Sequence, residues 1–269
     1  MCRKKLAVIG VGNMAKAIIG GVISSDITLS QIYLFDVNSV QCESLHSDKI
    51  SVVSSIKEAI EQSDSVLISV KPQNYEEVLY EIKALPSSKE KLFISIGAGI
   101  STEYVKNILG NVSVIRVLPN LPMLIGSGVS VICRSNSVSS ADFNFVKQLF
   151  LSSGSVIEIE ESEMNRVIGI TSSSPAYVFK FIDAIHKGAI EQGIDTPDLL
   201  GVICDMVIGS ALMLKNGSLT PSELISKVAS KGGTTERALS TLDKHQFSEG
   251  IVDAMKACTA RADELGAKK

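Results

Sequence analysis

The chain has 269 residues, of which 45% are hydrophobic and 20% charged, and its net charge is −3. This length and composition describe a folded protein of one large or two ordinary domains, and they exclude intrinsic disorder. The slight negative charge argues against a nucleic acid or a membrane surface as the partner.

Five cysteines are scattered along the chain, and none of the three histidines lies at a metal-ligand spacing. Cys2, Cys42, Cys133, Cys204 and Cys258 form no Cys-x-x-Cys motif, which indicates reduced thiols rather than a metal site or disulfides. No run of about 20 apolar residues suggests a membrane span. We therefore expect a cytoplasmic protein without a bound metal.

Short apolar strands alternate with helical segments through the first half of the chain. The strands are expected at residues 6–9, 32–36, 65–70, 92–96 and 112–117. This alternation predicts a doubly wound parallel sheet of the Rossmann type, covered by helices on both faces. The pattern changes near residue 160, so we expect a dinucleotide-binding domain over 1–160 and a helical domain over 161–269.

A glycine motif lies directly after the first strand and opens a helix. It reads Gly10-Val11-Gly12-Asn13-Met14-Ala15. The first glycine permits a tight turn, the second lets the backbone approach a pyrophosphate, and Ala15 allows close contact between helix and strand. The motif in this context predicts a dinucleotide site.

Asp36 ends the second strand, where an acid accepts a hydrogen bond from a ribose 2′-hydroxyl. Residues 36–41 contain no cation for a 2′-phosphate, which favours NADH, although Asn38 and Ser39 can still bind a phosphate. Three further turns follow strands and are expected at the same edge of the sheet: Val70-Lys71-Pro72, Gly97-Ala98-Gly99 and Pro119-Asn120.

The second half of the chain reads as helices over 176–192, 198–215, 221–230 and 248–265. Thr196-Pro197 and Thr220-Pro221 resemble an N-cap followed by an N1 proline, and Gly193 and Gly217 fall near helix ends. The segment 199–214 is apolar almost all round. Its burial calls for a second subunit, and the alternative is a central core helix in a monomer.

A second glycine-rich segment, Ser230-Lys231-Gly232-Gly233-Thr234-Thr235, opens another helix. Free backbone N–H groups at the positive end of a helix dipole bind anions. We expect a small carboxylate to accept hydrogen bonds from residues 232–235, and the Thr235 hydroxyl can donate to the same substrate. The alternative is a capped helix with a glycine turn.

These motifs, taken in order, resemble the 1-pyrroline-5-carboxylate reductase family along almost the whole chain. Besides the two glycine segments, the matching stretches are Val70-Lys71-Pro72-Gln73, residues 95–101, residues 116–120 and Pro175-Ala176-Tyr177-Val178-Phe179. The resemblance implies reduction of the cyclic imine to L-proline by NADPH or NADH. It also implies dimers formed through the helical domains, which assemble further into a decamer.

The resemblance assigns residues to both ligands. The cofactor residues are Gly10, Val11, Gly12, Asn13, Met14, Ala15, Asp36, Asn38, Val70, Lys71, Pro72 and Gly97. The substrate residues are Glu161, Ser230, Gly232, Gly233, Thr234 and Thr235, and Thr235 assists protonation of the imine nitrogen.

The chain departs from the family pattern at Leu121, Ser172, Ser174, Lys231 and Ile56. Serine fits at Ser172 and Ser174 only where the backbone does not need a positive φ. Two other functions stay open. A β-hydroxyacid dehydrogenase would need a lysine base, such as Lys180 or Lys187. A non-catalytic NAD(P)-binding redox sensor would explain the altered segment at 172–174.

Overall fold

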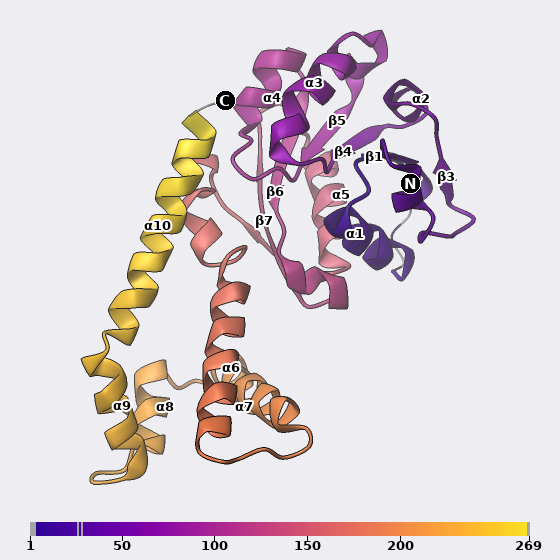
Figure 1. Cartoon of the computed structure of the whole chain (residues 1–269). Coiled ribbons are helices and arrows are strands. Elements are labelled where there is room, and N and C mark those ends of the chain that lie inside the picture. The colour runs from indigo at the N-terminus through magenta and orange to yellow at the C-terminus, as the bar shows by residue number, and fades with distance from the viewer. Residues whose placement is uncertain (1–3, 26, 28, 268–269) are drawn as a thin grey trace. The chain divides into compact units, whose positions relative to one another are not determined.

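The computed structural model describes residues 4–25, 27 and 29–267 of the chain (Figure 1). Cys2 lies outside the described residues. The chain divides into two compact units. The first comprises the N-terminal residues up to Ser173 together with the chain from Ala257 onward, and the second spans Ser174–Lys256. The division falls within the last helix.

Unit 1 contains an eight-stranded sheet in the order β3-β2-β1-β4-β5-β6-β7-β8. The strands are β1 (Lys4–Ile9), β2 (Leu29–Phe35), β3 (Ile50–Val52), β4 (Ser65–Ile68), β5 (Leu92–Ser95), β6 (Ser113–Leu118), β7 (Gly128–Arg134) and β8 (Gly154–Glu158). All neighbours are parallel except β6 and β7. The sequence-based expectation of a parallel sheet is confirmed for its first six strands.

Three strands are additional to those that the sequence predicts. β3 has only three residues at the edge of the sheet, too few for a visible pattern. β7 runs antiparallel to β6, because the connection through the short 3₁₀ helix at Leu121–Ile125 is too brief for a crossover. β8 lies at the other edge, with one face exposed and with Gly154 and Val156 only partly buried on the other, so it has no run of buried apolar residues.

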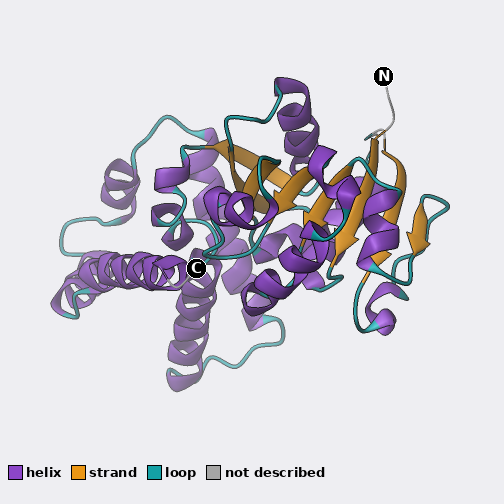
Figure 2. Ribbon diagram, turned by 90° about the horizontal axis from the view of Figure 1, so that it is seen from above, coloured by secondary structure: helices purple, strands orange, loops and turns teal. Residues whose placement is uncertain are grey.

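Helices cover both faces of the sheet (Figure 2). α1 (Asn13–Ile23) and α5 (Ser140–Leu151) pack on one face, in a core that includes Ile18 and Phe150. α2 (Ile56–Glu61), α3 (Tyr75–Lys83) and α4 (Thr102–Leu109) pack on the other, around the buried Tyr75 and Phe93. Both faces of β1, β4 and β5 are therefore buried, which explains their continuous apolar sequences.

The end of the chain returns to unit 1. α10 (Phe247–Ala267) carries Ala262 into a third apolar cluster, where it meets Leu118, Val131 and Cys133 of β6 and β7 with Met164 and Ile168. Asp263 of the same helix accepts a hydrogen bond from the Asn165 side chain at 2.8 Å.

Unit 2 is helical, with α6 (Ser174–Glu191), α7 (Leu199–Asn216), α8 (Pro221–Val228), α9 (Thr234–Lys244) and the first part of α10. Thr220 caps α8 as predicted, with Pro221 at N1 and Glu223 completing a capping box. The prediction that Thr196 and Pro197 begin a helix is wrong. Asp198 is the N-cap of α7 and has a positive φ of 66°, a conformation that aspartate tolerates better than most residues.

α7 exposes most of its apolar surface within one chain. Ile203 is its one buried residue, whereas Val202, Met206, Ile208 and Met213 are 46–62% exposed. By length and composition alone, α7 is the one helix in the described residues that is long and apolar enough to cross a membrane. Core helices of water-soluble proteins pass the same test. An apolar surface of this size marks an interface.

Candidate functional site

The glycine motif forms a tight turn between β1 and α1. Gly10 has a φ of +88°, and a Cβ atom there would lie 2.8 Å from Val70 Cγ1. Gly12 is the N-cap of α1, and a Cβ atom there would meet nothing within 4 Å. The first turn of a helix leaves its N–H groups without acceptors. Open space beside these donors fits a dinucleotide pyrophosphate.

Asp36 lies directly after β2, beside this turn. Its carboxylate accepts hydrogen bonds from the N–H of Val11 at 2.7 Å and from the N–H of Asn38 at 2.8 Å. Asp36 therefore fastens the glycine turn to the loop after β2. Asn38 is exposed in that loop.

The other predicted cofactor residues follow neighbouring strands. Val70, Lys71 and Pro72 follow β4, and Gly97 follows β5. Since β2, β1, β4 and β5 are adjacent and parallel, the structure brings these turns to one edge of the sheet. Gly97 has a packing role as well, because a Cβ atom there would lie 2.6 Å from the Tyr75 ring.

The predicted substrate corner lies in unit 2, at the start of α9. Gly233 is the N-cap, and Gly232 has a φ of +75°. The N–H of Gly233 donates to the Ser230 carbonyl oxygen at 2.9 Å, and the N–H of Gly232 donates to Glu236 Oε2 at 2.7 Å. Of the four donors that the sequence suggests, two already have acceptors, and the first-turn N–H groups of Thr234 and Thr235 are the ones that α9 leaves for an anion.

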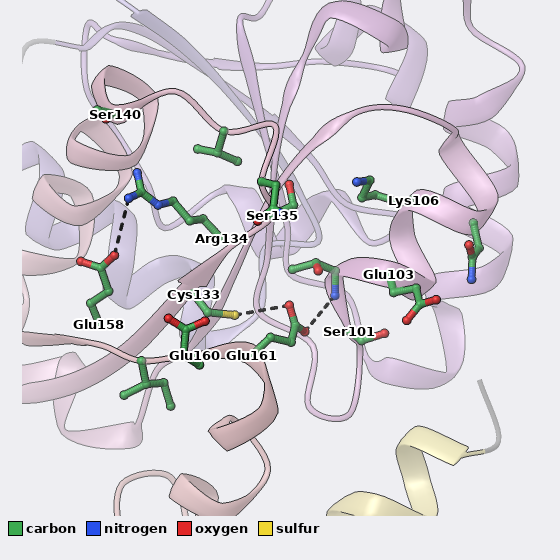
Figure 3. Close-up of a pocket in the computed structure, with 15 residues that line it drawn as sticks. Ser101, Glu103, Lys106, Cys133, Arg134, Ser135, Ser140, Glu158, Glu160 and Glu161 are labelled. Atoms are coloured by element: carbon green, nitrogen blue, oxygen red, sulfur yellow. Dashed lines mark hydrogen bonds and ion pairs between the residues drawn. The ribbon is translucent and has the colours of Figure 1, made fainter.

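Glu161 lies in unit 1, in the short 3₁₀ helix Glu161–Glu163 after β8. Its carboxylate accepts hydrogen bonds from Arg116 Nη1 at 3.2 Å and from the N–H of Thr102 at 3.0 Å, and the Cys133 thiol lies 3.5 Å away. Glu161, Thr102 and Cys133 line one side of a polar pocket of about 860 Å³ (Figure 3). Two cations, Lys106 and Arg134, line this pocket together with four glutamates, which are Glu103, Glu158, Glu160 and Glu161.

Sequence reasoning missed the partner that holds Glu161. Arg116 on β6 is 3% exposed, and its second terminal nitrogen donates to Asn165 Oδ1 at 2.9 Å. Within the described residues, Arg116 Nε is buried without a hydrogen-bond partner. The available signal was a charge inside an otherwise apolar strand, since an arginine is rarely buried unless it is paired.

The altered segment at 172–174 is compatible with serine. Among the described residues, Asp198 and Gln246 are the only non-glycine residues with a positive φ, so neither Ser172 nor Ser174 needs a glycine conformation. Ser172 Oγ also donates to the Pro119 carbonyl oxygen at 3.4 Å. Serine at these two positions therefore requires no strained backbone before α6.

Two protein-family models match the chain. The model described as pyrroline-5-carboxylate reductase dimerisation matches residues 161–265, and the model described as NADP oxidoreductase coenzyme F420-dependent matches residues 5–99.

Relatives match over nearly the whole chain. The chain is 35% identical to the pyrroline-5-carboxylate reductase of Haemophilus influenzae and 32% identical to that of Escherichia coli, covering 98% of each of those proteins. Among solved structures, the Plasmodium falciparum pyrroline carboxylate reductase with NADP bound has a TM-score of 0.89 at 26% identity, with 99% of both chains covered. The chain belongs to the pyrroline-5-carboxylate reductase family.

Proposed function

We propose that the chain reduces 1-pyrroline-5-carboxylate to L-proline with NADPH or NADH, as the last step of proline biosynthesis. Full-length similarity to pyrroline-5-carboxylate reductases carries this proposal. The open N-terminus of α1 beside Gly12 supports a dinucleotide site at the sheet edge. Asp36 after β2 is the feature that favours NADH.

In this proposal the glycine turn, Asp36, Asn38, Val70, Lys71, Pro72 and Gly97 hold the cofactor. The N–H groups of Gly12 to Met14 and the dipole of α1 stabilise the pyrophosphate. When bound, the reduced nicotinamide supplies the hydride that adds to the imine carbon. The protein contributes mainly by fixing the position of each ligand.

The corner at 230–235 holds the substrate carboxylate in this proposal, with Ser230, Gly232 and Gly233 shaping the turn and Thr234 and Thr235 donating N–H groups. The Thr235 hydroxyl donates a hydrogen bond to the imine nitrogen and helps to deliver its proton. An imine takes a proton readily from water, so no strong general acid is needed. Glu161 belongs to the proposed substrate residues by family resemblance.

We further propose a homodimer formed through a helical domain over 161–269, next to a dinucleotide-binding domain over 1–160. The match of residues 161–265 to a dimerisation model and the exposed apolar surface of α7 support it. Assembly of the dimers into a decamer and a cytoplasmic location complete the proposal, the latter because the scattered cysteines suit a reducing compartment.

The test is oxidation of NADH and NADPH in the presence of 1-pyrroline-5-carboxylate, followed by the loss of nicotinamide absorbance. Wild type and Gly12→Asp are compared, because the aspartate side chain would enter the space proposed for the pyrophosphate. Turnover by wild type alone supports the reductase. A folded wild type that consumes neither cofactor would overturn it, and turnover of 3-hydroxy acids instead would favour a dehydrogenase.

A further inference from the structure

The structure brings a cation to the loop that the sequence shows without one. Lys16 lies in the first half of α1, and its ammonium group donates to Gln41 Oε1 at 3.0 Å. Gln41 belongs to the 3₁₀ helix η1 (Ser39–Cys42), which begins three residues after Asp36. Lys16 precedes Gln41 by 25 residues, so the sequence of the loop at 36–41 does not reveal this cation.

Lys16 holds its charge without a counter-ion. Across the part of the chain that the structure describes, no carboxylate lies within ion-pair distance of its ammonium group. Its partner Gln41 is a neutral amide, which orients the ammonium but does not neutralise it. Lys16 is half-buried, and its hydrogen bond to Gln41 holds the ammonium group beside this loop.

The charges of Asp36 and Lys16 both influence the electrostatic environment of the loop that follows β2. Both alter the pKa of the buried Cys42 thiol, which is raised first by burial and then by the Asp36 carboxylate, and lowered by the Lys16 ammonium. The thiol thus lies within electrostatic reach of both charges. Asp36 occurs where the ribose 2′ position of a dinucleotide is recognised, so a 2′-substituent would lie in the field of Lys16 as well.

The hydrogen bonds of Asp36 change what it can do for a ribose. Each of its carboxylate oxygens already accepts one backbone N–H, from Val11 or from Asn38. These two hydrogen bonds fix the position of the carboxylate in the loop, and the two N–H donors balance part of its negative charge. The Asp36 carboxylate therefore repels a neighbouring phosphate less strongly, and the positive charge of Lys16 can offset the repulsion that is left.

We infer that Lys16 recognises the 2′-phosphate of NADPH, with Asn38 and Ser39 as neutral donors, and that it gives the enzyme a preference for NADPH over NADH. This inference rests on the dinucleotide site of the proposed function. It reverses the preference that residues 36–41 alone favour, because the recognising cation comes from α1 and not from the loop.

The test separates the 2′-phosphate from the rest of the nucleotide. Calorimetric binding of 2′,5′-ADP and of 5′-AMP is measured for wild type, Lys16→Met, Lys16→Arg and the control Lys57→Met. Lys57 is an exposed lysine of α2 that pairs loosely with Glu61 at 3.9 Å. The same four proteins are then assayed with NADPH and NADH.

Wild type should bind 2′,5′-ADP at least about tenfold more tightly than 5′-AMP, since a charge-assisted contact to a dianion is worth about 1.5–3 kcal/mol. Lys16→Met should remove most of this ratio and leave 5′-AMP binding within about twofold. Lys16→Arg should restore the ratio, and Lys57→Met should match wild type. The ratio of kcat/KM for NADPH to that for NADH should fall in parallel, through KM for NADPH.

Three outcomes would overturn the inference. Equal affinity of wild type for both nucleotides would show that no 2′-phosphate subsite exists. A ratio retained in Lys16→Met would assign the recognition to other residues. Failure of folded wild type to bind either nucleotide would remove the dinucleotide site itself, and with it the cofactor part of the proposed function.

Discussion

The buried guanidinium of Arg116 meets the carboxylate of Glu161 at 3.2 Å, and this pair joins the sheet to the segment that follows its last strand. The Arg116 side chain is 4% exposed and that of Glu161 is 32% exposed. An ion pair so placed contributes little to stability by its presence alone, but breaking it leaves a charge in an apolar surrounding. The pair therefore fixes where Glu161 lies in unit 1.

Glu161→Gln should destabilise the protein by about 3 kcal/mol, because it leaves the Arg116 charge buried without a counter-ion. The matched control is Glu158→Gln in the same pocket, where Glu158 faces Arg134 at 4.0 Å and both side chains are exposed. The control should change stability by less than about 0.5 kcal/mol. Urea unfolding followed by circular dichroism measures both, and equal losses would contradict the role assigned to Arg116.

Alanine substitutions at the two glycines of the first turn should affect different properties, stability at Gly10 and cofactor binding at Gly12. Gly10→Ala should lower stability, because φ is +88° and the new Cβ would lie 2.8 Å from Val70 Cγ1. Gly12→Ala should leave stability nearly unchanged, because its Cβ enters open space. If that space holds a pyrophosphate, Gly12→Ala should still weaken NADPH binding. Thermal unfolding and the fluorescence of bound NADPH separate the two effects, and a stable Gly12→Ala with unchanged affinity would contradict the proposed site.

Thr235→Ala should lower kcat by about one to two powers of ten if the hydroxyl assists protonation of the imine. Thr235→Ser keeps the hydroxyl and should retain most of the rate, whereas Thr235→Val keeps the shape and should resemble alanine. None of the three changes removes the N–H at position 235, so KM should change less than kcat. Steady-state kinetics on the three variants is the measurement, and unchanged kinetics in Thr235→Val would remove the hydroxyl from the mechanism.

Alkaline pH should destabilise the protein partly through Cys133. Burial, and after it the neighbouring Glu161 carboxylate, raise the pKa of the Cys133 thiol to about 12. An unfolded thiol titrates near pH 8.5. Below that pH the thiol is neutral in both states, so its effect on stability is constant. As the pH rises toward 12, the unfolded chain loses its proton first, which favours unfolding.

The measurement is the urea midpoint of wild type and Cys133→Ser at several pH values between neutrality and about pH 10.5. A serine hydroxyl does not titrate in this range, so the variant should lose less stability as the pH rises. Tyr75, whose pKa burial raises to about 12, contributes equally to both proteins. Parallel curves for wild type and Cys133→Ser would contradict the prediction.

Ile208→Asp should dissociate the proposed dimer, because Ile208 is 55% exposed on α7 and a buried carboxylate at an interface is costly. The control is Tyr80→Asp on α3, where the tyrosine is 53% exposed in unit 1. Light scattering after size exclusion should give a smaller mass for Ile208→Asp alone. If both variants keep the mass of wild type, α7 does not form the interface.

Most residues of the proposed cofactor site could be predicted from the sequence, because each of them follows a buried strand within a few positions. Gly10, Asp36, Val70 and Gly97 are each readable from the strand before them. Lys16 and Arg116 are different, since each acquires its role through a partner at least 25 residues away. A pattern of neighbouring residues contains no information about such a contact, which depends on how helices pack on the sheet.

Strand prediction failed at β3, where the segment was short, and at β8, where burial was incomplete, and it also missed β7, although five of the seven residues of β7 are buried. β8 lies at an edge and exposes most of its residues, so it lacks the apolar run that identifies β4 and β5. The start of α7 was predicted to within one residue, but its cap was wrongly assigned to Thr196 and Pro197, because Asp198 has a left-handed backbone and places Pro197 outside the helix. Thr220-Pro221 is the same Thr-Pro dipeptide, and there it does begin a helix, with Glu223 completing the capping box.

The return of α10 to unit 1 has a consequence for synthesis of the chain. Ala262 completes the apolar cluster on β6 and β7, although those strands end 128 residues or more before it. A ribosome delivers the chain from its N-terminus, so the part of this cluster that Ala262 covers stays open until α10 has left the exit tunnel. Unit 1 therefore completes this part of its core only after α10 has been synthesised, and not when its last strand has been.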